Sequence, residues 1–402
     1  MKLAILSDFH LGYERFSRDA YAQAAQALEA ASQAADVLLI PGDIFDMRAP
    51  KPEVLAEAIN LFRNLQQKKW AAKVVDFKGE GAIYSNAPII AIPGTHERRA
   101  AGAADPVDLL NLAGLLVDIS DATAMIAKGD EKVAVRGLGG IAEERFRESL
   151  IAADVKPVAG AFNVFLFHQS VYELLPFSKD FINIDELPKG FDLYVDGHIH
   201  GRVEKRAHGK PFLIPGSTVL TQLKDSEQEQ KGFYIFDTTS GKYEFHKISS
   251  RKFSVVTFNV GSKEPAAIRN GVERAIDAAI LEAGANEPII RVELHGKLRD
   301  GFKHIDLDLA GIPRSYKGKA MVEIAKGSME LTETEALSSD VRKGTLDNVS
   351  VKDFGMGILM TNLARAGYKL KVNPTALFEL LSADLSKDKT VKKVLEELFE
   401  KG

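Results

Sequence analysis

The sequence predicts an α/β fold, and three observations lead to this prediction. Short apolar runs alternate with helical patterns through the first half of the chain. A strand, a helix and a second strand in that order imply crossover connections within an α/β sheet. Finally, His or Asp residues follow five of these strands, at the sheet edge where open α/β folds place their sites.

The elements of the first 250 residues follow from apolar periodicity. Five runs predict buried strands: Leu3–Leu6, Val37–Ile40, Ile89–Ile92, Val164–Phe167 and Leu193–Val195. Apolar residues at helical spacing lie between the first three of these strands, from 21 to 31 and from 54 to 65. Three runs that lie closer together predict antiparallel strands that close the domain: Phe212–Ile214, Phe233–Phe236 and Tyr243–Ile248.

Four regions are predicted along the chain: an α/β domain at 1–250, a small α+β unit at 251–330, a polar linker at 331–350 and a helical region at 351–402. The second region contains a predicted strand at Ser254–Val260, an apolar helix face from 268 to 280 and a strand at Ile289–Leu294. The last region is predicted to hold two short amphipathic helices, one of which begins at Asn373-Pro374, an N-cap and first-turn pair.

Composition excludes several classes of protein. The 402 residues are 45% hydrophobic and 27% charged, which is typical of a soluble protein with two or three domains. The absence of cysteine excludes disulfides, thiolate metal sites and thiol nucleophiles. No apolar stretch reaches the roughly 18 residues of a membrane span, and polar Ser7, Asp8 and His10 leave no room for a signal peptide. We therefore expect a cytoplasmic protein with no membrane contact.

The charge balance limits how the chain could bind nucleic acid. Its 52 basic and 56 acidic residues give a net charge of −4, whereas proteins that coat DNA by bulk electrostatics are usually basic. Binding would have to use metal ions or local patches. Two basic clusters follow candidate site residues and are either phosphate contacts or solvated surface: Arg98 and Arg99, then Arg202, Lys205, Arg206, His208 and Lys210.

The candidate site residues all follow predicted strands. They are, in chain order, Asp8 and His10, Asp43, His96, His168, and His198 with His200. Any one of them alone would be an ordinary loop residue, and five of the nine histidines fall in these segments. Their coincidence at five strand ends predicts a functional site.

The donor types predict a metal centre. Carboxylates and imidazoles without thiolates suit manganese, iron or zinc rather than a closed structural zinc site. Seven candidates exceed the needs of one tetrahedral ion, which favours two ions about 3.5–4 Å apart that share one bridging carboxylate. Gly42, Gly94 and Gly197 are expected to form the tight turns that bring the following residues onto the metals.

These motifs resemble a known family. Asp8-x-His10, Gly42-Asp43, Gly94-x-His96-Glu97, His168 and Gly197-His198-x-His200 resemble the signature of the calcineurin-like metallophosphoesterases. Their order, spacing and the chain length most resemble the archaeal nuclease of the meiotic-recombination-eleven family, which acts in double-strand-break repair. The resemblance implies a sandwich of two mixed sheets flanked by helices, a small α+β capping domain that shapes access to DNA, and C-terminal helices.

The resemblance also implies roles for the site residues. One metal would lie on Asp8, His10, Asp43 and His200, and the second on Asp43, His168, His198 and Thr95. His96 would be catalytic, since it would stabilise or protonate the leaving oxygen. The implied activity is exonuclease and single-strand endonuclease cleavage of DNA with two manganese ions, or with iron or zinc. The implied partners are DNA, a second copy in a homodimer, and a coiled-coil ATPase bound by the C-terminal helices.

Two residues depart from the family pattern. Thr95 stands where the family usually has Asn, and a hydroxyl is a shorter and poorer metal ligand than an amide oxygen. Asp46 stands where the nuclease branch often has His. Gly42-Asp43-Ile44-Phe45-Asp46 partly matches the phosphoprotein phosphatases, but their pattern continues Arg-Gly and this chain continues Met47-Arg48, which argues against a phosphoprotein phosphatase.

Two alternatives to a DNA nuclease remain open from the sequence. A phosphodiesterase of small nucleotides on the same core would have a closed pocket rather than a groove, and no use for the C-terminal helices. A tether for DNA ends, with an impaired metal site, would bind DNA without cleaving it.

Overall fold

The computed structural model of the chain describes residues 1–78, 85, 87–98, 103–175, 178, 180–223, 227–261, 263–284, 287–299 and 302–329. The described residues divide into two compact units, with the boundary between Ser254 and Val255. The sequence places this boundary at 250, four residues earlier. The linker expected at 331–350 and the helices expected at 351–402 lie outside the described residues.

The first unit is built on two mixed sheets. The six-stranded sheet has the order β13 (Tyr243–Lys247), β12 (Gly232–Asp237), β1 (Lys2–Ile5), β2 (Val37–Pro41), β4 (Ile89–Ile92) and β5 (Val117–Asp118). The seven-stranded sheet has the order β10 (Val203–Ala207), β11 (Lys210–Ile214), β9 (Leu193–Asp196), β8 (Phe162–Phe167), β7 (Glu131–Leu138), β6 (Thr123–Lys128) and β3 (Lys73–Lys78). Parallel and antiparallel pairs occur in both sheets, so the predicted sandwich of mixed sheets is confirmed.

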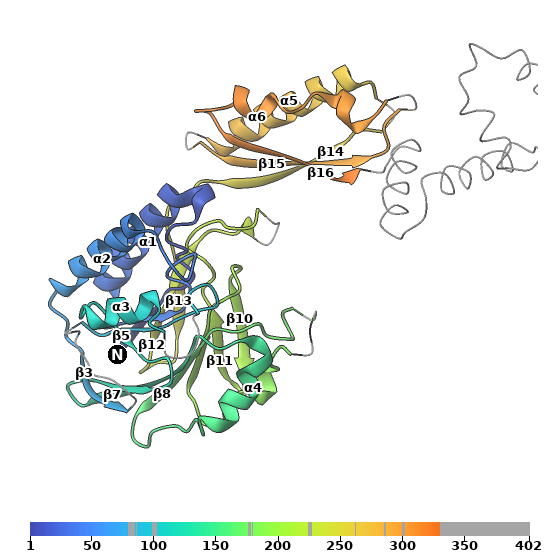
Figure 1. Cartoon of the computed structure of the whole chain (residues 1–402). Helices are drawn as coiled ribbons and strands as arrows, with labels where there is room; N and C mark the ends of the chain where they lie inside the picture. The colour runs from blue at the N-terminus through green and yellow to red at the C-terminus, as the bar shows by residue number, and fades with distance from the viewer. Residues whose placement is uncertain are drawn as a thin grey trace, which may run out of the picture. The chain divides into compact units, whose positions relative to one another are not determined.

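Successive side chains of a strand point to opposite faces of its sheet, and this alternation explains how the sheets and helices are layered. In β1, Leu3 and Ile5 belong to the core between the two sheets, whereas Ala4 belongs to the core beneath the helices. This pattern places α1 (Ser17–Ala34), α2 (Pro52–Gln66) and α3 (Pro106–Leu112) on the outer face of the six-stranded sheet, and α4 (Glu143–Ala152) on that of the other (Figure 1). Two short 3-10 helices, η1 (Glu14–Phe16) and η2 (Ile184–Glu186), also lie in this unit.

One expectation about the closing strands is wrong. β12 and β13 are antiparallel neighbours in the six-stranded sheet, as the sequence predicts. However, β11 lies in the other sheet, where it is parallel to β9 and antiparallel to β10. The β10–β11 turn uses left-handed backbone at His208 and Gly209. Apolar periodicity does not reveal β10, because this edge strand exposes Glu204, Lys205 and Arg206 to solvent.

The second unit has one three-stranded sheet. Its order is β14 (Phe253–Asn259), β15 (Ile289–Gly296) and β16 (Met321–Met329), with β15 and β16 parallel. The long α5 (Pro265–Ala283) packs its buried Ile268, Val272 and Ile276 into a separate core, and α6 (Ile312–Ser315) and η4 (His304–Leu307) follow β15 (Figure 1). Within the described part of the chain, no helix has the length and apolarity to cross a membrane.

Candidate metal centre

The predicted site residues lie in loops that follow strands of both sheets. Asp8, Asp43 and His96 follow β1, β2 and β4 of the six-stranded sheet. His168 and His198 follow β8 and β9 of the seven-stranded sheet. The sequence predicts one sheet edge, and the structure instead assembles the site where the carboxyl ends of strands from two sheets meet.

Four of the candidate ligands have left-handed backbone. The φ angles are +53° at Asp8, +46° at His10, +50° at Asp43 and +67° at His198. Such angles are uncommon for residues other than glycine, and each costs about 1–3 kcal/mol. These conformations persist only where the surrounding structure holds the backbone in place. The loops are therefore held in sharp bends at these ligand-type side chains.

The three glycines of the motifs act in two different ways. Gly42 has φ +94° and forms the expected tight turn before Asp43. Gly94 and Gly197 lie outside the left-handed region and are needed instead for close packing. A Cβ at Gly94 would lie 2.2 Å from Asp43 Oδ1, and one at Gly197 would lie 2.2 Å from the Pro41 carbonyl oxygen. Gly94 thus lets two loops of the six-stranded sheet touch, and Gly197 lets a loop of the seven-stranded sheet touch the end of β2.

Asp8, His10 and His200 form one group of ligand atoms, all within 4.8 Å of one another. The Nε2 atoms of His10 and His200 face each other at 3.1 Å. Each Nε2 lies 4.0 Å from Asp8 Oδ1. Asp8 and His10 are almost completely buried. Two imidazole nitrogens directed at one another beside a buried carboxylate form a ready cation site.

Asp43, His168 and His198 form the second group. His168 Nδ1 donates a hydrogen bond to the Pro41 carbonyl at 2.6 Å. Its Nε2 therefore faces Asp43 Oδ2, 3.2 Å away, in a buried setting. A proton or a metal ion is needed between these two atoms, since both carry lone pairs.

Divalent metals fit the donors of both groups. Among the described residues, Asp8 Oδ2 is a buried atom that makes no hydrogen bond, and the buried His168 Nε2 has no polar neighbour for a hydrogen bond other than the facing Asp43 carboxylate. Buried polar atoms without a hydrogen bond are rare in native proteins, and a bound ion can satisfy them in place of a hydrogen bond. The oxygen and imidazole donors, with no thiolate, match the metals that the sequence predicts.

The charges of the second group depend strongly on one another. Burial alone would lower the pKa of His168, but the Asp43 carboxylate raises that pKa to about 10. Burial would raise the pKa of Asp43, but His168 holds it well below its usual range. Burial and the charge of His168 lower the pKa of His198 to about 3. The buried Asp43 carboxylate is thus stabilised by positive charge beside it, a role that a cation can also fill.

The far nitrogens of two ligand histidines are held by polar partners. Asp46 Oδ1 lies 3.2 Å from His10 Nδ1, and Thr221 Oγ1 lies 2.5 Å from His200 Nδ1. A hydrogen bond at Nδ1 leaves Nε2 as the ligand atom. Sequence reasoning assigned no role to Asp46 or Thr221. The structure places Asp46 as the acceptor that orients His10.

Thr95 lies beside the second group. Its exposed hydroxyl is 3.3 Å from His198 Nδ1, and the backbone N–H of His198 donates to Asp8 Oδ1 at 3.2 Å. On the other side of the ring, His198 Nε2 is 3.4 Å from Glu143 Oε1 at the start of α4. All seven predicted ligands are therefore brought together. Glu143 is a neighbour that no sequence motif indicated.

His96 is bound differently from the ligand candidates. Its Nδ1 donates to the backbone carbonyl of Asp46 at 2.7 Å, and its ring meets that of His10 edge-on with centroids 4.9 Å apart. Its side chain is 43% exposed, whereas that of His10 is 1% exposed. The backbone N–H of His96 donates to Asp43 Oδ1 at 2.9 Å. His96 thus shares a third group of possible ligand atoms with His10 and Asp46, and its side chain remains open to solvent.

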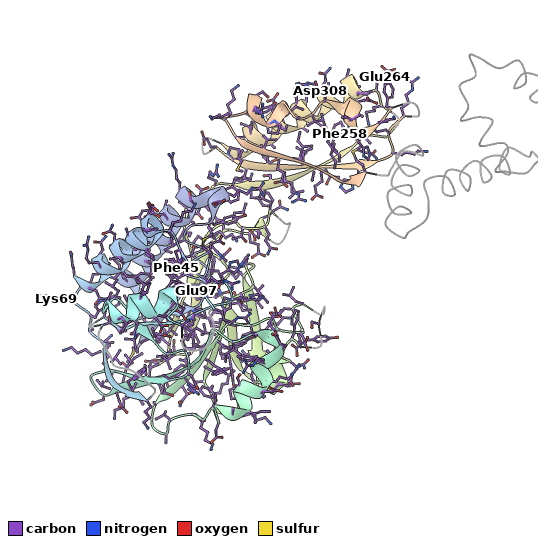
Figure 2. All side chains as sticks on the ribbon, viewed as in Figure 1. Phe45, Lys69, Glu97, Phe258, Glu264 and Asp308 are labelled. Carbon is purple, nitrogen blue, oxygen red and sulfur yellow. The ribbon has the colours of Figure 1, made fainter. Side chains whose placement is uncertain are left out.

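Glu97 ties two of the site loops together. This completely buried carboxylate accepts hydrogen bonds from the backbone N–H groups of Asp43 (3.1 Å), Gly94 (2.8 Å) and Phe45 (2.8 Å). Figure 2 shows Glu97 beside Phe45 in the interior of the first unit. Burial, followed by the charge of Asp43, raises the pKa of Glu97 well above its usual value. The sequence motif contains Glu97, and only the structure shows that it positions the Asp43 loop.

The predicted basic clusters are partly neutralised. Arg202 lies 3.7 Å from Glu229 and packs over the Phe245 ring. Lys210 forms an ion pair with Asp192 at 3.0 Å. His208 forms a hydrogen bond with the Leu187 carbonyl. Arg98, Lys205 and Arg206 are exposed. Arg99 lies outside the described residues.

Comparison with known proteins places this site in a family. Residues 1–202 match the family model of the calcineurin-like phosphoesterases. The chain is 27% identical over 393 residues to the DNA double-strand break repair protein Mre11 of Methanopyrus kandleri, covering 82% of this chain and 83% of that one. It is 25% identical over 353 residues to the protein of the same name from Saccharolobus solfataricus, with coverages of 83% and 86%.

A third relative matches the chain over a shorter stretch. The double-strand break repair protein MRE11 of Encephalitozoon cuniculi is 28% identical over 259 residues, which cover 58% of this chain and 45% of that protein. The family match at 1–202 spans half of the chain and includes all seven predicted ligands and His96. The chain therefore belongs to the calcineurin-like phosphoesterase family and is a metal-dependent phosphoester hydrolase.

Proposed function

We propose that this chain is a two-metal phosphodiesterase that cleaves DNA, as an exonuclease and single-strand endonuclease, during the processing of double-strand-break ends. The observation that carries the proposal is the pair of adjacent ligand groups, Asp8–His10–His200 and Asp43–His168–His198. The DNA substrate is supported by relatives named as double-strand break repair proteins, which match about four-fifths of the chain.

The proposed ligand sets follow the two groups. Asp8, His10, Asp43 and His200 would hold one ion. The second ion would be held by Asp43, His168, His198 and Thr95. Two divalent ions bound there would polarise the phosphoester and activate a water for in-line attack. We propose manganese as the metal, with iron or zinc as alternatives that the same donors accept.

His96 is proposed to hold the proton that the leaving sugar oxygen takes up. Its Nδ1–H is already committed to the Asp46 carbonyl, so Nε2 is the nitrogen available to a substrate. The Asp46 carboxylate lies 3.7 Å from Nδ1. A ring held at one nitrogen, with the other nitrogen within reach of a substrate, has the geometry that a general acid needs.

The remaining parts of the proposal concern the regions outside the site. The unit at 251–330 would shape access to DNA, and the helices predicted within 351–402 would bind a coiled-coil ATPase. The chain would act as a homodimer in the cytoplasm. The names of the relatives support a role in a repair assembly.

One assay separates this function from its rivals. The full chain is incubated with labelled single- and double-stranded DNA and with a small nucleotide diester, with manganese or with a chelator, beside an Asp43→Asn variant. Manganese-dependent DNA cleavage that the variant loses is the expected result. DNA binding without cleavage would support a tether, and cleavage of the small diester alone would support a small-nucleotide phosphodiesterase.

A further inference from the structure

A buried polar network lies behind His200. It consists of Thr221, Glu227 and Lys231, whose exposed fractions are 8%, 3% and 6%. All three follow the family match, which ends at residue 202. Buried charges are costly unless they are paired and hydrogen-bonded, so this network needs a physical reason.

The hydrogen bonds of the Thr221 hydroxyl run in one direction. The hydroxyl has a single proton, which it donates to Glu227 Oε1 at 2.8 Å. Its contact with His200 Nδ1 at 2.5 Å must then be one in which the hydroxyl oxygen accepts. The imidazole proton of His200 is therefore on Nδ1, and the lone pair on Nε2 faces Asp8 and His10.

Glu227 gives this chain of bonds its direction. A hydroxyl by itself does not determine which nitrogen of His200 carries the proton, because it can donate to Nδ1 or accept from it. An ionised carboxylate only accepts, so it takes the hydroxyl proton. Glu227 Oε1 also lies 3.4 Å from His200 Nδ1, so the carboxylate favours a proton on this nitrogen directly as well as through the hydroxyl. At His10 and His168, the Asp46 carboxylate and the Pro41 carbonyl accept from Nδ1 directly.

Glu227 is itself rigidly held. Its oxygens accept from the backbone N–H groups of Thr221 at 2.8 Å and of Gln222 at 3.2 Å. Lys231 Nζ lies 3.9 Å from the carboxylate and donates to Ser217 Oγ at 2.9 Å and to the His200 carbonyl at 3.2 Å. The network thus holds both the ring and the backbone of His200.

We propose that Glu227, acting together with the Thr221 hydroxyl on His200 Nδ1, is a positioning residue that keeps His200 in the Nδ1–H form with Nε2 ready to bind a metal ion. The inference rests on the proposed two-metal centre. The opposite tautomer would direct an N–H at His10 Nε2, 3.1 Å away, and would leave no lone pair for the ion.

The tautomer can be measured directly in the unmodified chain. Side-chain ¹⁵N NMR of the full-length protein, chelator-treated and at a pH where the ring is neutral, reports which nitrogen carries the proton. The His200 signals are assigned by their loss in His200→Asn. We expect protonated Nδ1 and unprotonated Nε2. A His200 proton on Nε2 would overturn the inference without any mutation.

Metal affinity supplies the second readout. Manganese titrations by calorimetry compare the natural chain with Thr221→Val, Thr221→Ser and Glu227→Gln. Thr221→Val and Glu227→Gln should weaken one of the two ions by ~10–100-fold, which is typical when a partner behind a metal ligand is lost. Thr221→Ser keeps the hydroxyl and should bind as the natural chain does.

Thr218→Val is the matched control, because Thr218 is also buried and its hydroxyl bonds to none of the described residues. Its metal affinity should be unchanged. Two ions bound equally well by all variants would refute the role of Glu227 and leave the proposed function intact. Absence of metal binding by the natural chain would instead refute the proposed function.

Discussion

At the scale of single residues, His96 and the ligand histidines differ in their surroundings. His10 and His168 are buried, and each has its Nδ1 beside an oxygen acceptor. His96 is exposed at the rim and borders His10 through a ring contact. Exposure to solvent suits a group that meets substrate, and burial suits a group that holds an ion.

His96→Ala tests this distinction. We expect the variant to bind both metal ions and to lose about 10²–10⁴-fold in kcat, which is the usual contribution of a general acid. Calorimetry measures the metal stoichiometry and a DNA cleavage assay measures kcat. Loss of one ion in the variant would make His96 a ligand and contradict the proposed role.

Thr95 predicts unequal metal sites. Its hydroxyl is exposed and lies 3.3 Å from His198 Nδ1, and a neutral hydroxyl is a weak donor to a divalent ion. The second ion should therefore bind more weakly than the first, and activity should rise late in a manganese titration. Thr95→Asn should tighten the weaker step by ~10–100-fold, whereas Thr95→Ser should not. Two equal affinities that Thr95→Asn leaves unchanged would exclude this prediction.

At the scale of elements, the N-terminus of α3 lies near an acidic side chain at the end of β5. Asp105 caps α3 and forms a capping box with Asp108. Asp118 accepts two hydrogen bonds from Ser120. Burial, with smaller contributions from Asp105 and Asp108, raises the pKa of Asp118 to about 7 from 3.8. The junction between α3 and β5 therefore becomes less stable as this carboxyl ionises.

The sign of the pH dependence follows from the raised pKa. The folded state keeps its proton when the unfolded state has lost it, so the stabilisation is complete below 3.8 and is lost as pH rises through 7. A shift of three pKa units corresponds to ~4 kcal/mol of stability. Because Asp118 is partly exposed, we expect its ionisation to cost about 1–2 kcal/mol of stability. Asp118→Asn should be more stable than the natural chain by this amount at pH 8, with a smaller difference at pH 5.

Urea unfolding of both proteins at the two pH values measures this difference. Asp130→Asn, in the exposed turn between β6 and β7, is the control and should show no such pH dependence. Equal stabilities of Asp118→Asn and the natural chain at pH 8 would contradict the prediction.

At the scale of the whole molecule, the chain forms two units with separate cores, and all predicted ligands lie in the first. Metal binding should therefore stabilise the first unit alone. At a free manganese concentration of 100 Kd, one site adds about 2.7 kcal/mol, which corresponds to a rise in Tm of roughly 5–10 °C for a domain of this size. Scanning calorimetry with manganese or chelator measures the shift, and Asp43→Asn should abolish it. An equal rise in the Tm of the unfolding transitions of both units would contradict the prediction that metal binding stabilises the first unit alone.

The sequence predicts more of the site than of the sheets. All five strands that precede site residues were predicted near their observed bounds, because each is a continuous apolar run. β3, β5, β6, β7 and β10 of the first unit and β16 of the second were not predicted. β3 and β10 are edge strands with exposed charged residues, so neither has the apolar run by which buried strands are recognised.

By itself, the sequence determined the chemistry of the centre: which oxygen and nitrogen donors follow which strands, in which order, with no thiolate among them. Only the tertiary structure decided that these strand ends come from two sheets, and which acceptors hold the histidine rings. His10 and His200 face each other although 190 residues separate them in sequence. Asp46 contacts His10 Nδ1, and Thr221, which is itself bonded to Glu227, contacts His200 Nδ1. The physical reason is that apolar periodicity is a local property of the chain. Hydrogen bonds between distant loops instead depend on how the sheets pack, and no spacing along the sequence records that packing.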